Sequence, residues 1–478
     1  MNLNFFLMKQ ISFLGIAIFS VFCAKKQEVN IAPPVVSDPV SYWVTNADQS
    51  ALLKKQTTGL FTGNVNNTYP VIDIDSSQRF QEIDGFGYTL TGGSAYLINQ
   101  MDAGARLNLL KELFGNSEDA IGISYLRISI GASDLSRTVF SYNDLPSGET
   151  DTMLNKFSLS LDTVDLIPVI KQIQAINPYI KFMGSPWSPP VWMKSNQSSI
   201  GGFLLPKYYS VYANYFVKYL QVMKQRGIEV DAITIQNEPQ HGGNNPSLLM
   251  SASEQADFIK NHIGPAFKKN KITTKIIIWD HNCDNPNYPI SILNDTEAKP
   301  YIDGSAFHLY SGDISALSVV KAAHPDKAIY FTEQWTGKNG QFGGDLMWHI
   351  KNVIIGSVRN HSKVALEWNL ANNPDLSMHT PGGCTECKGA LTIFGSTVTR
   401  NVSYYIIAHA SKFVPAGSVR IASSFAGEFY SAAFITPTGK KVVIVLNSGS
   451  KTTSFNIRYA QKWLTTQLDA GAVATFVI

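Results

Sequence analysis

The sequence predicts an α/β protein: a (β/α)8 barrel, or TIM barrel, with a small β-sandwich fused to it. The chain has 478 residues, which is enough for a barrel of ~250 residues and a smaller domain. Residues 81–412 alternate short apolar runs with longer amphipathic stretches, which is typical of βα units around a parallel sheet. Residues 413–478 change to short alternating segments separated by turns, which is typical of a sandwich.

Eight apolar runs between residues 81 and 412 are predicted to be the barrel strands. They are residues 83–87, 125–130, 180–185, 232–236, 275–279, 304–308, 328–332 and 363–368. Residues 161–176, 208–223 and 254–267 repeat apolar side chains at helical spacing and are predicted helices between the strands. Eight such units favour a closed barrel over an open sheet.

The sandwich is predicted from segments at both ends of the barrel. The C-terminal strands are residues 419–424, 429–435, 442–447, 453–458 and 473–478, with turns at 437–439 and 447–449. Before the barrel, residues 71–75 also alternate as a strand does. We therefore expect the segment 41–80 to contribute to the sandwich.

The N-terminus is typical of a targeting segment. Lys9 precedes an apolar run over residues 11–22 that ends at Cys23, too short for a membrane span and suited to a signal peptide. We predict that residues 1–23 are a lipoprotein-type signal with Cys23 lipidated, although Phe22 stands where a small residue is usual. Residues 24–40 are then a tether. The protein is expected to be exported, as an outer-membrane lipoprotein facing the periplasm or cell surface, or else secreted.

Composition argues against two classes of partner. The net charge is +3 with acids and bases interspersed, and no basic stripe indicates nucleic-acid binding. No long apolar window follows the N-terminus, so membrane contact is expected only through the lipid anchor.

Cys384 and Cys387 form a Cys-Thr-Glu-Cys pair. Zinc would need two more ligands, and only His379 lies close in sequence, so we predict no metal site. In an exported protein the pair favours a disulfide. Cys283 is then a lone buried thiol.

Polar, charged or aromatic residues follow seven of the eight predicted strands. They stand at residues 131–134, 185–188, 237–239, 280–282, 308–310, 333–335 and 367–369. The carboxyl ends of barrel strands converge on one face, where active sites of such barrels lie. The sequence therefore predicts a site at this face.

Two glutamates end predicted strands that nearly face each other across the barrel mouth, Glu238 after the fourth and Glu333 after the seventh. Glycoside hydrolysis needs one carboxylic acid and one carboxylate, ~5–5.5 Å apart when anomeric configuration is retained. We predict that Glu238 is the general acid/base, because the Asn237 amide beside it can bind the sugar 2-hydroxyl, and that Glu333 is the nucleophile. For either glutamate alone, a loop salt bridge is the simpler role.

Other residues at this face are candidates for binding sugar. We expect Asp134 to clamp sugar hydroxyls, and His308 to bind a hydroxyl, to orient Glu333 or simply to be a buried core histidine. The aromatic candidates for walls and platforms of the sugar pocket, each of which can also be ordinary packing, are Trp187, Tyr310, Trp335 and Trp368. The competing carboxylates are Glu82, Asp84 and Glu367.

Five motifs together resemble glycoside hydrolase family 30, the glucosylceramidase-like group. They are Ile83-Asp-Gly-Phe-Gly87, Arg127-Ile-Ser-Ile-Gly131, Ser185-Pro-Trp-Ser-Pro-Pro190 with Trp192-Met-Lys194, Gln236-Asn-Glu-Pro239 and Glu367-Trp-Asn-Leu370. The resemblance runs from about residue 70 to the C-terminus. It implies a barrel with a fused sandwich, retention of configuration and no cofactor. It also implies acid/base and nucleophile roles for Glu238 and Glu333, and a sugar pocket formed by Asp134, Trp187, Asn237, His308 and Trp368.

Details within these motifs favour one substrate class. The run from His379 to Cys387, followed by Gly389-Ala-Leu-Thr392, resembles the branch with bacterial and fungal endo-β-1,6-glucanases. No acidic residue stands near Gly92, where ceramide-glucoside cleavers tend to carry one. We expect a β-1,6-glucan substrate. The alternatives are a glucosylceramidase, an exo-acting β-glucosidase, β-xylosidase or β-fucosidase, and a non-catalytic carbohydrate-binding lipoprotein.

Overall fold

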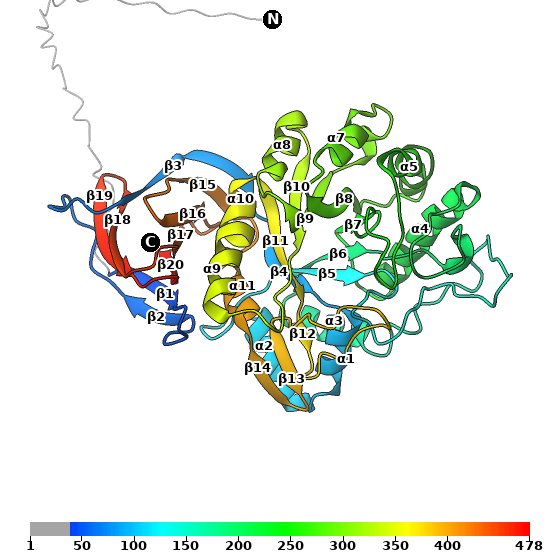
Figure 1. Ribbon diagram of the computed structural model, residues 1–478, viewed down its shortest axis with the longest axis horizontal. Coiled ribbons are helices and arrows are strands. Elements are labelled where there is room, and N and C mark those ends of the chain that lie inside the picture. The colour runs from blue at the N-terminus through cyan, green and yellow to red at the C-terminus, as the bar shows by residue number, and fades with distance from the viewer. Residues whose placement is uncertain (1–38) are drawn as a thin grey trace, which may run out of the picture. The chain divides into compact units, whose positions relative to one another are not determined.

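The computed structural model describes residues 39–478, so the predicted signal peptide, Cys23 and nearly all of the tether lie outside the described residues. Eight parallel strands close into a barrel (Figure 1). In barrel order they are β4 (Gly85–Thr89), β5 (Tyr125–Ser129), β6 (Lys181–Ser185), β7 (Ala232–Thr234), β8 (Lys275–Cys283), β9 (Gly304–Gly312), β10 (Ala328–Glu333) and β11 (Ser362–Asn369). The predicted barrel is confirmed, with one strand in each predicted run.

Helices surround the barrel in the predicted alternation. The α-helices are α1 (Gly92–Gln100), α2 (Ala103–Phe114), α3 (Leu166–Ile176), α4 (Tyr209–Gln225), α5 (Ala252–Phe258), α6 (Gly264–Lys269), α7 (Asn287–Asn294), α8 (Ala316–Ala323), α9 (Phe342–His349), α10 (Ser357–Arg359) and α11 (Val402–Ser411). The predicted helix 161–176 begins only at Leu166, because residues 161–165 form turns. The predicted helix 254–267 is interrupted by a π-helical turn, Ile259–Ile263.

The barrel interior is filled by an apolar layer. Inward side chains from seven strands form one buried cluster, made of Tyr125, Met183, Ala232, Ile277, Ala306, Tyr330, Val364 and Leu366. Such packing closes the middle of a barrel to solvent. Only the ends of the barrel are therefore available for a site.

The second domain is built on a nine-stranded sheet in the order β19-β18-β3-β15-β16-β17-β20-β1-β2. The bounds are β1 (Ser41–Thr45), β2 (Lys54–Thr57), β3 (Val71–Glu82), β15 (Val419–Ser423), β16 (Phe429–Ile435), β17 (Lys441–Asn447), β18 (Thr453–Tyr459), β19 (Lys462–Leu468) and β20 (Val473–Val477). Val44, near one edge of the sheet, and Leu464, at the other, share one buried cluster, so the sheet folds over its own core as a sandwich. A small sheet of β12 (Ala371–Asn372), β13 (Leu391–Phe394) and β14 (Thr397–Arg400) lies beside the barrel.

Helix α11 joins the barrel to the sandwich. His409 on this helix is hydrogen-bonded through its two ring nitrogens to the hydroxyls of Thr45 and Thr475, both at 2.9 Å. Burial lowers the pKa of His409 to about 3, so its ring is neutral and acts as a structural connector. Within residues 39–478, no helix is long and apolar enough to cross a membrane.

Candidate active site

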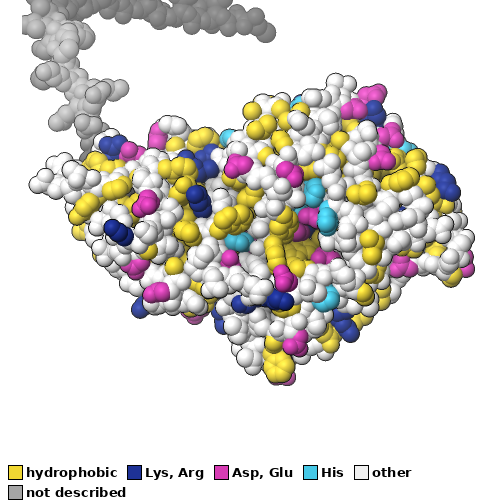
Figure 2. All heavy atoms as spheres, viewed as in Figure 1, with side chains coloured by type: hydrophobic (Ala, Val, Ile, Leu, Met, Phe, Trp, Pro, Cys, Tyr) yellow, Lys and Arg dark blue, Asp and Glu magenta, His cyan; other side chains and the backbone are white. Residues whose placement is uncertain are grey.

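A pocket of about 280 Å³ opens at the carboxyl ends of the barrel strands. Figure 2 looks onto this face, where acidic, histidine and hydrophobic side chains gather around a hollow. The lining contains Asp134, Trp187, Glu238, Tyr310, Glu333, Trp335 and Trp368, which were predicted, together with His241, Asn244, His281, Asn282, Cys384 and Cys387. Its volume is at the small end for ligand sites, which suits a single sugar ring at the centre.

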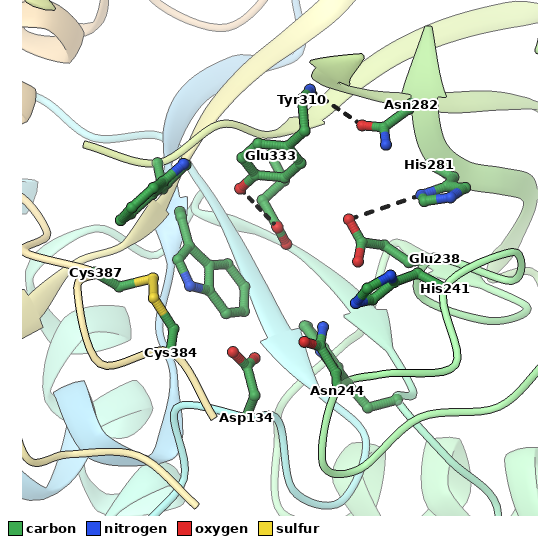
Figure 3. A pocket seen from close by; sticks show the side chains of 13 residues that line it. Asp134, Glu238, His241, Asn244, His281, Asn282, Tyr310, Glu333, Cys384 and Cys387 are labelled. Atoms are coloured by element: carbon green, nitrogen blue, oxygen red, sulfur yellow. Dashed lines mark hydrogen bonds and ion pairs between the residues drawn. A yellow bond between two sulfur atoms is a disulfide. The ribbon is translucent and has the colours of Figure 1, made fainter. Parts of the chain in front are cut away.

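Glu238 and Glu333 lie close together in this pocket. Nδ1 of His308 is 3.1 Å from Oε1 of Glu238 and 3.8 Å from Oε1 of Glu333. Figure 3 shows the two carboxylates directed into the same space, with Asp134 across the pocket from Glu333. The topology therefore brings together two residues that are far apart in the sequence.

Arg127 on β5 lies beneath the pocket and forms hydrogen bonds with three residues of this cluster. Its fully buried guanidinium donates to Glu333 Oε2 at 2.5 Å, to Asn237 Oδ1 at 2.6 Å and to Asp280 Oδ2 at 2.7 Å. The Asn237 oxygen is thereby engaged, and its Nδ2 donates to no group within residues 39–478, although Asn237 is not among the residues that line the pocket. Arg127 also lies 4.7 Å from the ring of Trp187.

His308 connects Glu238 to Asp280, which lies beneath the pocket. Its Nε2 is 3.1 Å from Asp280 Oδ1, and its Nδ1 is 3.1 Å from Glu238 Oε1. It was expected to bind a sugar hydroxyl, to orient Glu333 or to be a buried core histidine. It is fully buried and does not line the pocket, which agrees with the last alternative, and its Nδ1 is closer to Glu238 than to Glu333.

The charges of this cluster set its protonation. Burial lowers the pKa of His308, but the charges of Glu333, Asp280 and Glu238 outweigh burial and raise it to about 9. Burial works against ionisation of Glu238, yet the neighbouring imidazoles of His281 and His308 lower the pKa of Glu238 overall. Because Glu238 and His308 are hydrogen-bonded, the pair holds one shared proton at neutral pH.

Glu333 has a different environment. Burial raises the pKa of Glu333, and the charges of Glu238 and Asp280 raise it further, against the cations His308 and Arg127. The carboxylate is fixed on both oxygens, because Tyr310 donates its hydroxyl to Oε1 at 3.0 Å and Arg127 donates to Oε2. A carboxylate held in this way is oriented as an attacking group must be.

A distorted stretch of backbone positions Glu238 and Asp280. Glu238, Trp279 and Asp280 have positive φ angles of 47°, 73° and 61°, which non-glycine residues rarely adopt. The register of β8 against β9 shifts between Trp279 and His281, and the Glu238 N–H donates to the Asp280 carbonyl at 3.0 Å. Such local strain is concentrated at functional sites.

Asp134 and the disulfide form the opposite wall. Cys384 and Cys387 are joined by a disulfide, and both pack against Trp187 and Trp368. Gly383 approaches so closely that a Cβ there would lie 2.3 Å from the Asp134 carbonyl oxygen. Burial, followed by the charges of Glu333 and Glu238, raises the pKa of Asp134 to about 7.

The competing carboxylates lie elsewhere. Asp84 forms ion pairs with Lys181 at 2.9 Å and Lys363 at 3.3 Å. Glu367 is buried against His349 at 2.7 Å and does not line the pocket. Glu82 ends β3 in the sandwich sheet and is exposed. None of these three lines the pocket between Glu238 and Glu333.

No particular role was predicted for several residues that the structure places here, although residues 280–282 were expected at this face. They are Arg127, His241, Asn244, Asp280, His281 and Asn282. Arg127 carried a signal, since it lies two residues after the inward-facing Tyr125 on the same strand and therefore faces the same side. His241 and Asn244 lie in an irregular loop, for which periodicity offers no signal.

The fold and this pair of carboxylates define a glycoside hydrolase with a TIM-barrel catalytic domain. Residues 83–414 match the glycosyl hydrolase family 30 TIM-barrel domain, and residues 417–476 match the beta-sandwich domain of the same family. The chain belongs to glycoside hydrolase family 30.

Three relatives illustrate the range of the family. The chain is 32% identical to endo-1,6-beta-D-glucanase neg1 of Aspergillus fumigatus, over 82% of this chain and 84% of the relative. It is 28% identical to the lysosomal acid glucosylceramidase of Mus musculus, over 82% and 80% of the two chains. A solved structure of the endo-beta1,6-glucanase BT3312 superposes with a TM-score of 0.85 at 32% identity, covering 92% of this chain and 99% of that one.

Proposed function

We propose that this glycoside hydrolase is a retaining endo-β-1,6-glucanase that cleaves its substrate by double displacement. The observation that carries the proposal is the placement of Glu238 and Glu333 around one histidine nitrogen at the mouth of the barrel. Oε1 of Glu238 lies 3.1 Å from that nitrogen and Oε1 of Glu333 lies 3.8 Å from it. The distance between the two oxygens therefore cannot exceed the sum of these two distances. That limit includes the ~5–5.5 Å of retaining enzymes and reaches only the lower edge of the ~6.5–9.5 Å of inverting ones.

In the first step, Glu333 attacks the anomeric carbon and forms a carbon–oxygen bond. The glycosidic bond breaks, and the leaving oxygen takes the proton that Glu238 shares with His308. Arg127 and Tyr310 hold the attacking carboxylate in place, while the free amide N–H of Asn237 is available to the sugar 2-hydroxyl.

In the second step, Glu238 acts as a base and removes a proton from water. The water oxygen attacks the same carbon, and the bond to Glu333 breaks. The two inversions give net retention. The proton taken from water replaces the one that Glu238 and His308 shared before the reaction. Asp280 remains ionised next to Arg127 throughout.

The linkage is proposed from the similarity to two endo-1,6-glucanases. The glucosylceramidase alternative is supported by the mouse relative at slightly lower identity. Incubation with β-1,6-glucan, β-1,3-glucan and aryl β-glycosides, with product sizing, separates these functions. An endo-1,6-glucanase releases oligosaccharides from the first polymer and largely ignores aryl glucosides, whereas an exo-acting enzyme releases the aryl group.

We also propose export as a lipoprotein, on the basis of the N-terminal apolar run that ends at Cys23. Metabolic labelling with palmitate tests it. Label is expected in the wild-type protein and absent in Cys23→Ser, and equal labelling of both would contradict the proposal.

A further inference from the structure

Three metal-ligating atoms converge at the wall of the pocket. Oε1 of Glu238, a ring nitrogen of His281 and a ring nitrogen of His308 all lie within 4.8 Å of one another. All three residues are buried, and Glu238 and His281 also line the pocket. The proposed hydrolysis uses Glu238 and His308 but gives no role to His281.

His281 carries the independent sign of a ligand. Its Nδ1 makes no hydrogen bond within residues 39–478, although the residue is only 7% exposed. That nitrogen points at Glu238 Oε1 from 3.7 Å, too far for a hydrogen bond (Figure 3). A buried, unpartnered nitrogen is costly unless something else occupies the space before it.

His308 is oriented as metal-binding histidines are. Asp280 accepts from its Nε2 side at 3.1 Å, and Thr332 in turn fixes Asp280 with a hydroxyl at 2.7 Å. When Nε2 carries the proton, the lone pair on Nδ1 faces Glu238. A carboxylate behind the imidazole is the usual support of a histidine that binds zinc.

The donor set selects the class of ion. Two imidazoles and one carboxylate suit Zn²⁺ and similar borderline transition ions, whereas Mg²⁺ and Ca²⁺ require mostly oxygen ligands. Tetrahedral zinc with bonds of ~2.0–2.1 Å places neighbouring ligand atoms about 3.3 Å apart. The separations of Glu238 Oε1 from the two histidine nitrogens, 3.1 Å and 3.7 Å, bracket this value, and the two nitrogens lie within 4.8 Å of each other.

We propose that Glu238, His281 and His308 form a binding site for Zn²⁺ or a similar transition ion, and that binding there inhibits the enzyme. A bound ion needs a neutral His308 and an ionised Glu238, so it displaces the proton required by the leaving group. Glu333 Oε1, 3.8 Å from His308 Nδ1, lies close enough to supply a fourth ligand or to contact a bound water. Binding is independent of the proposed function, whereas inhibition depends on it.

Calorimetric titration of the full-length protein with ZnCl2 tests the binding directly. One site per chain is expected for Zn²⁺ and none for Mg²⁺. His281→Ala should weaken Zn²⁺ binding at least about ten-fold, since even the loss of a residue that supports a ligand weakens binding by that much. His241→Ala is the matched control, because His241 lines the same pocket but is outside the donor set. Thermal unfolding without metal verifies that both variants fold.

Two results would overturn the site: no Zn²⁺ binding by the wild-type chain, or equal Zn²⁺ affinity in the wild-type and His281→Ala chains. The visible absorption of added Co²⁺ gives a second readout, expected to show four-coordinate nitrogen and oxygen ligation in the wild-type protein and to weaken in His281→Ala. Zn²⁺ should also compete with β-glucan in hydrolysis, reversed by a chelator. Binding without inhibition would leave the metal site standing and contradict the role of Glu238 as acid.

Discussion

Two layers of the barrel interior, one directly above the other, follow opposite chemical rules. The lower layer is apolar, while the upper layer is polar and contains Arg127, Ser185, Thr234, His308 and Thr332. Each of these five lies two residues after a member of the lower layer on the same strand: Tyr125, Met183, Ala232, Ala306 and Tyr330. Inward positions repeat every two residues along a strand. The next inward position after a core residue on these strands therefore belongs to the polar layer of the site.

The difference shows what each layer demands of its residues. The lower layer needs only apolar volume, so its members are exchangeable for others of similar size. The upper layer buries charges, which is tolerable only when each charge is paired and hydrogen-bonded. Asp280 meets this condition with Arg127, Thr234, Thr332 and His308 around it. The upper layer thus holds Glu238 and Glu333 in fixed positions.

The largest effect is expected in Glu333→Gln, which removes the attacking carboxylate but keeps the size of the side chain. The rate of glucan hydrolysis should fall on the order of 10⁴-fold, as for other enzymes that lose a nucleophile. Initial rates on β-1,6-glucan measure it. Glu386→Gln, a half-exposed glutamate paired with Lys338 beside the pocket, is the control and should stay near wild type. A Glu333→Gln variant with even a tenth of the wild-type rate would contradict its role.

Arg127→Met tests whether the upper layer depends on its central cation. The substitution leaves Asp280 and Glu333 buried without their main counter-charge, so unfolding free energy should fall by about 3–5 kcal/mol. Activity of the folded fraction should fall as well, because Glu333 loses its support. Denaturant unfolding and kinetics measured on the same preparation provide both values.

Met183→Ala in the lower layer is the matched comparison for Arg127→Met. A cavity there should reduce unfolding free energy by about 2–5 kcal/mol. Activity of the folded protein should remain near wild type, since Met183 belongs to the apolar cluster and does not line the pocket. Equal losses of activity in the two variants would contradict the claim that the upper layer, and not the lower one, supports the reacting groups.

The pH dependence of kcat/KM reports the protonation of Glu333 and of the Glu238–His308 pair. Glu333 must be ionised, and its pKa is raised, so the rate should fall on the acid side at a higher pH than an unperturbed glutamate would give. The Glu238–His308 pair must keep its proton, so the rate should also fall as pH rises through about 9. An alkaline limb near ~6.5, the ordinary pKa of histidine, would contradict the charge arrangement around His308.

The smallest effect is expected at the rim, where the disulfide supports Trp187 and Trp368. Replacing Cys384 and Cys387 together by serine should loosen this wall and raise KM about ten-fold, equivalent to about 1.4 kcal/mol. kcat should change little, because the disulfide belongs to the wall of the pocket that contains Asp134 and makes no hydrogen bond to Glu238 or Glu333. A larger loss in kcat than in KM would show that the wall positions the reacting groups.

Much of the fold was predictable from the sequence because apolar strands and helices repeat with clear periods. The eight barrel runs and the strand-end positions of Glu238 and Glu333 follow from that pattern. Strand β19 was missed because its turn uses Ala460 and Gln461, both with positive φ, in place of the usual Asn or Gly. No turn residue marks this hairpin.

The polar layer was harder to predict for a physical reason. Asp280 enters it through a bulge in β8 with positive φ at Trp279 and Asp280, and no glycine marks that geometry in the sequence. The alternation of β5 places Arg127 on the inward side with Tyr125, but its partners Ser185 and Glu333 lie 58 and 206 residues away in the sequence. Long-range charge pairing leaves no local pattern.

The central claim is that Glu333 attacks the sugar while Glu238 supplies the proton. Azide rescue of Glu333→Ala tests it most directly, because the small anion can occupy the space that the carboxylate leaves. With an activated β-glucoside, azide should restore turnover and yield the α-glucosyl azide, of inverted configuration. No rescue, or a β-glucosyl azide, would contradict the assignment of Glu333 as nucleophile.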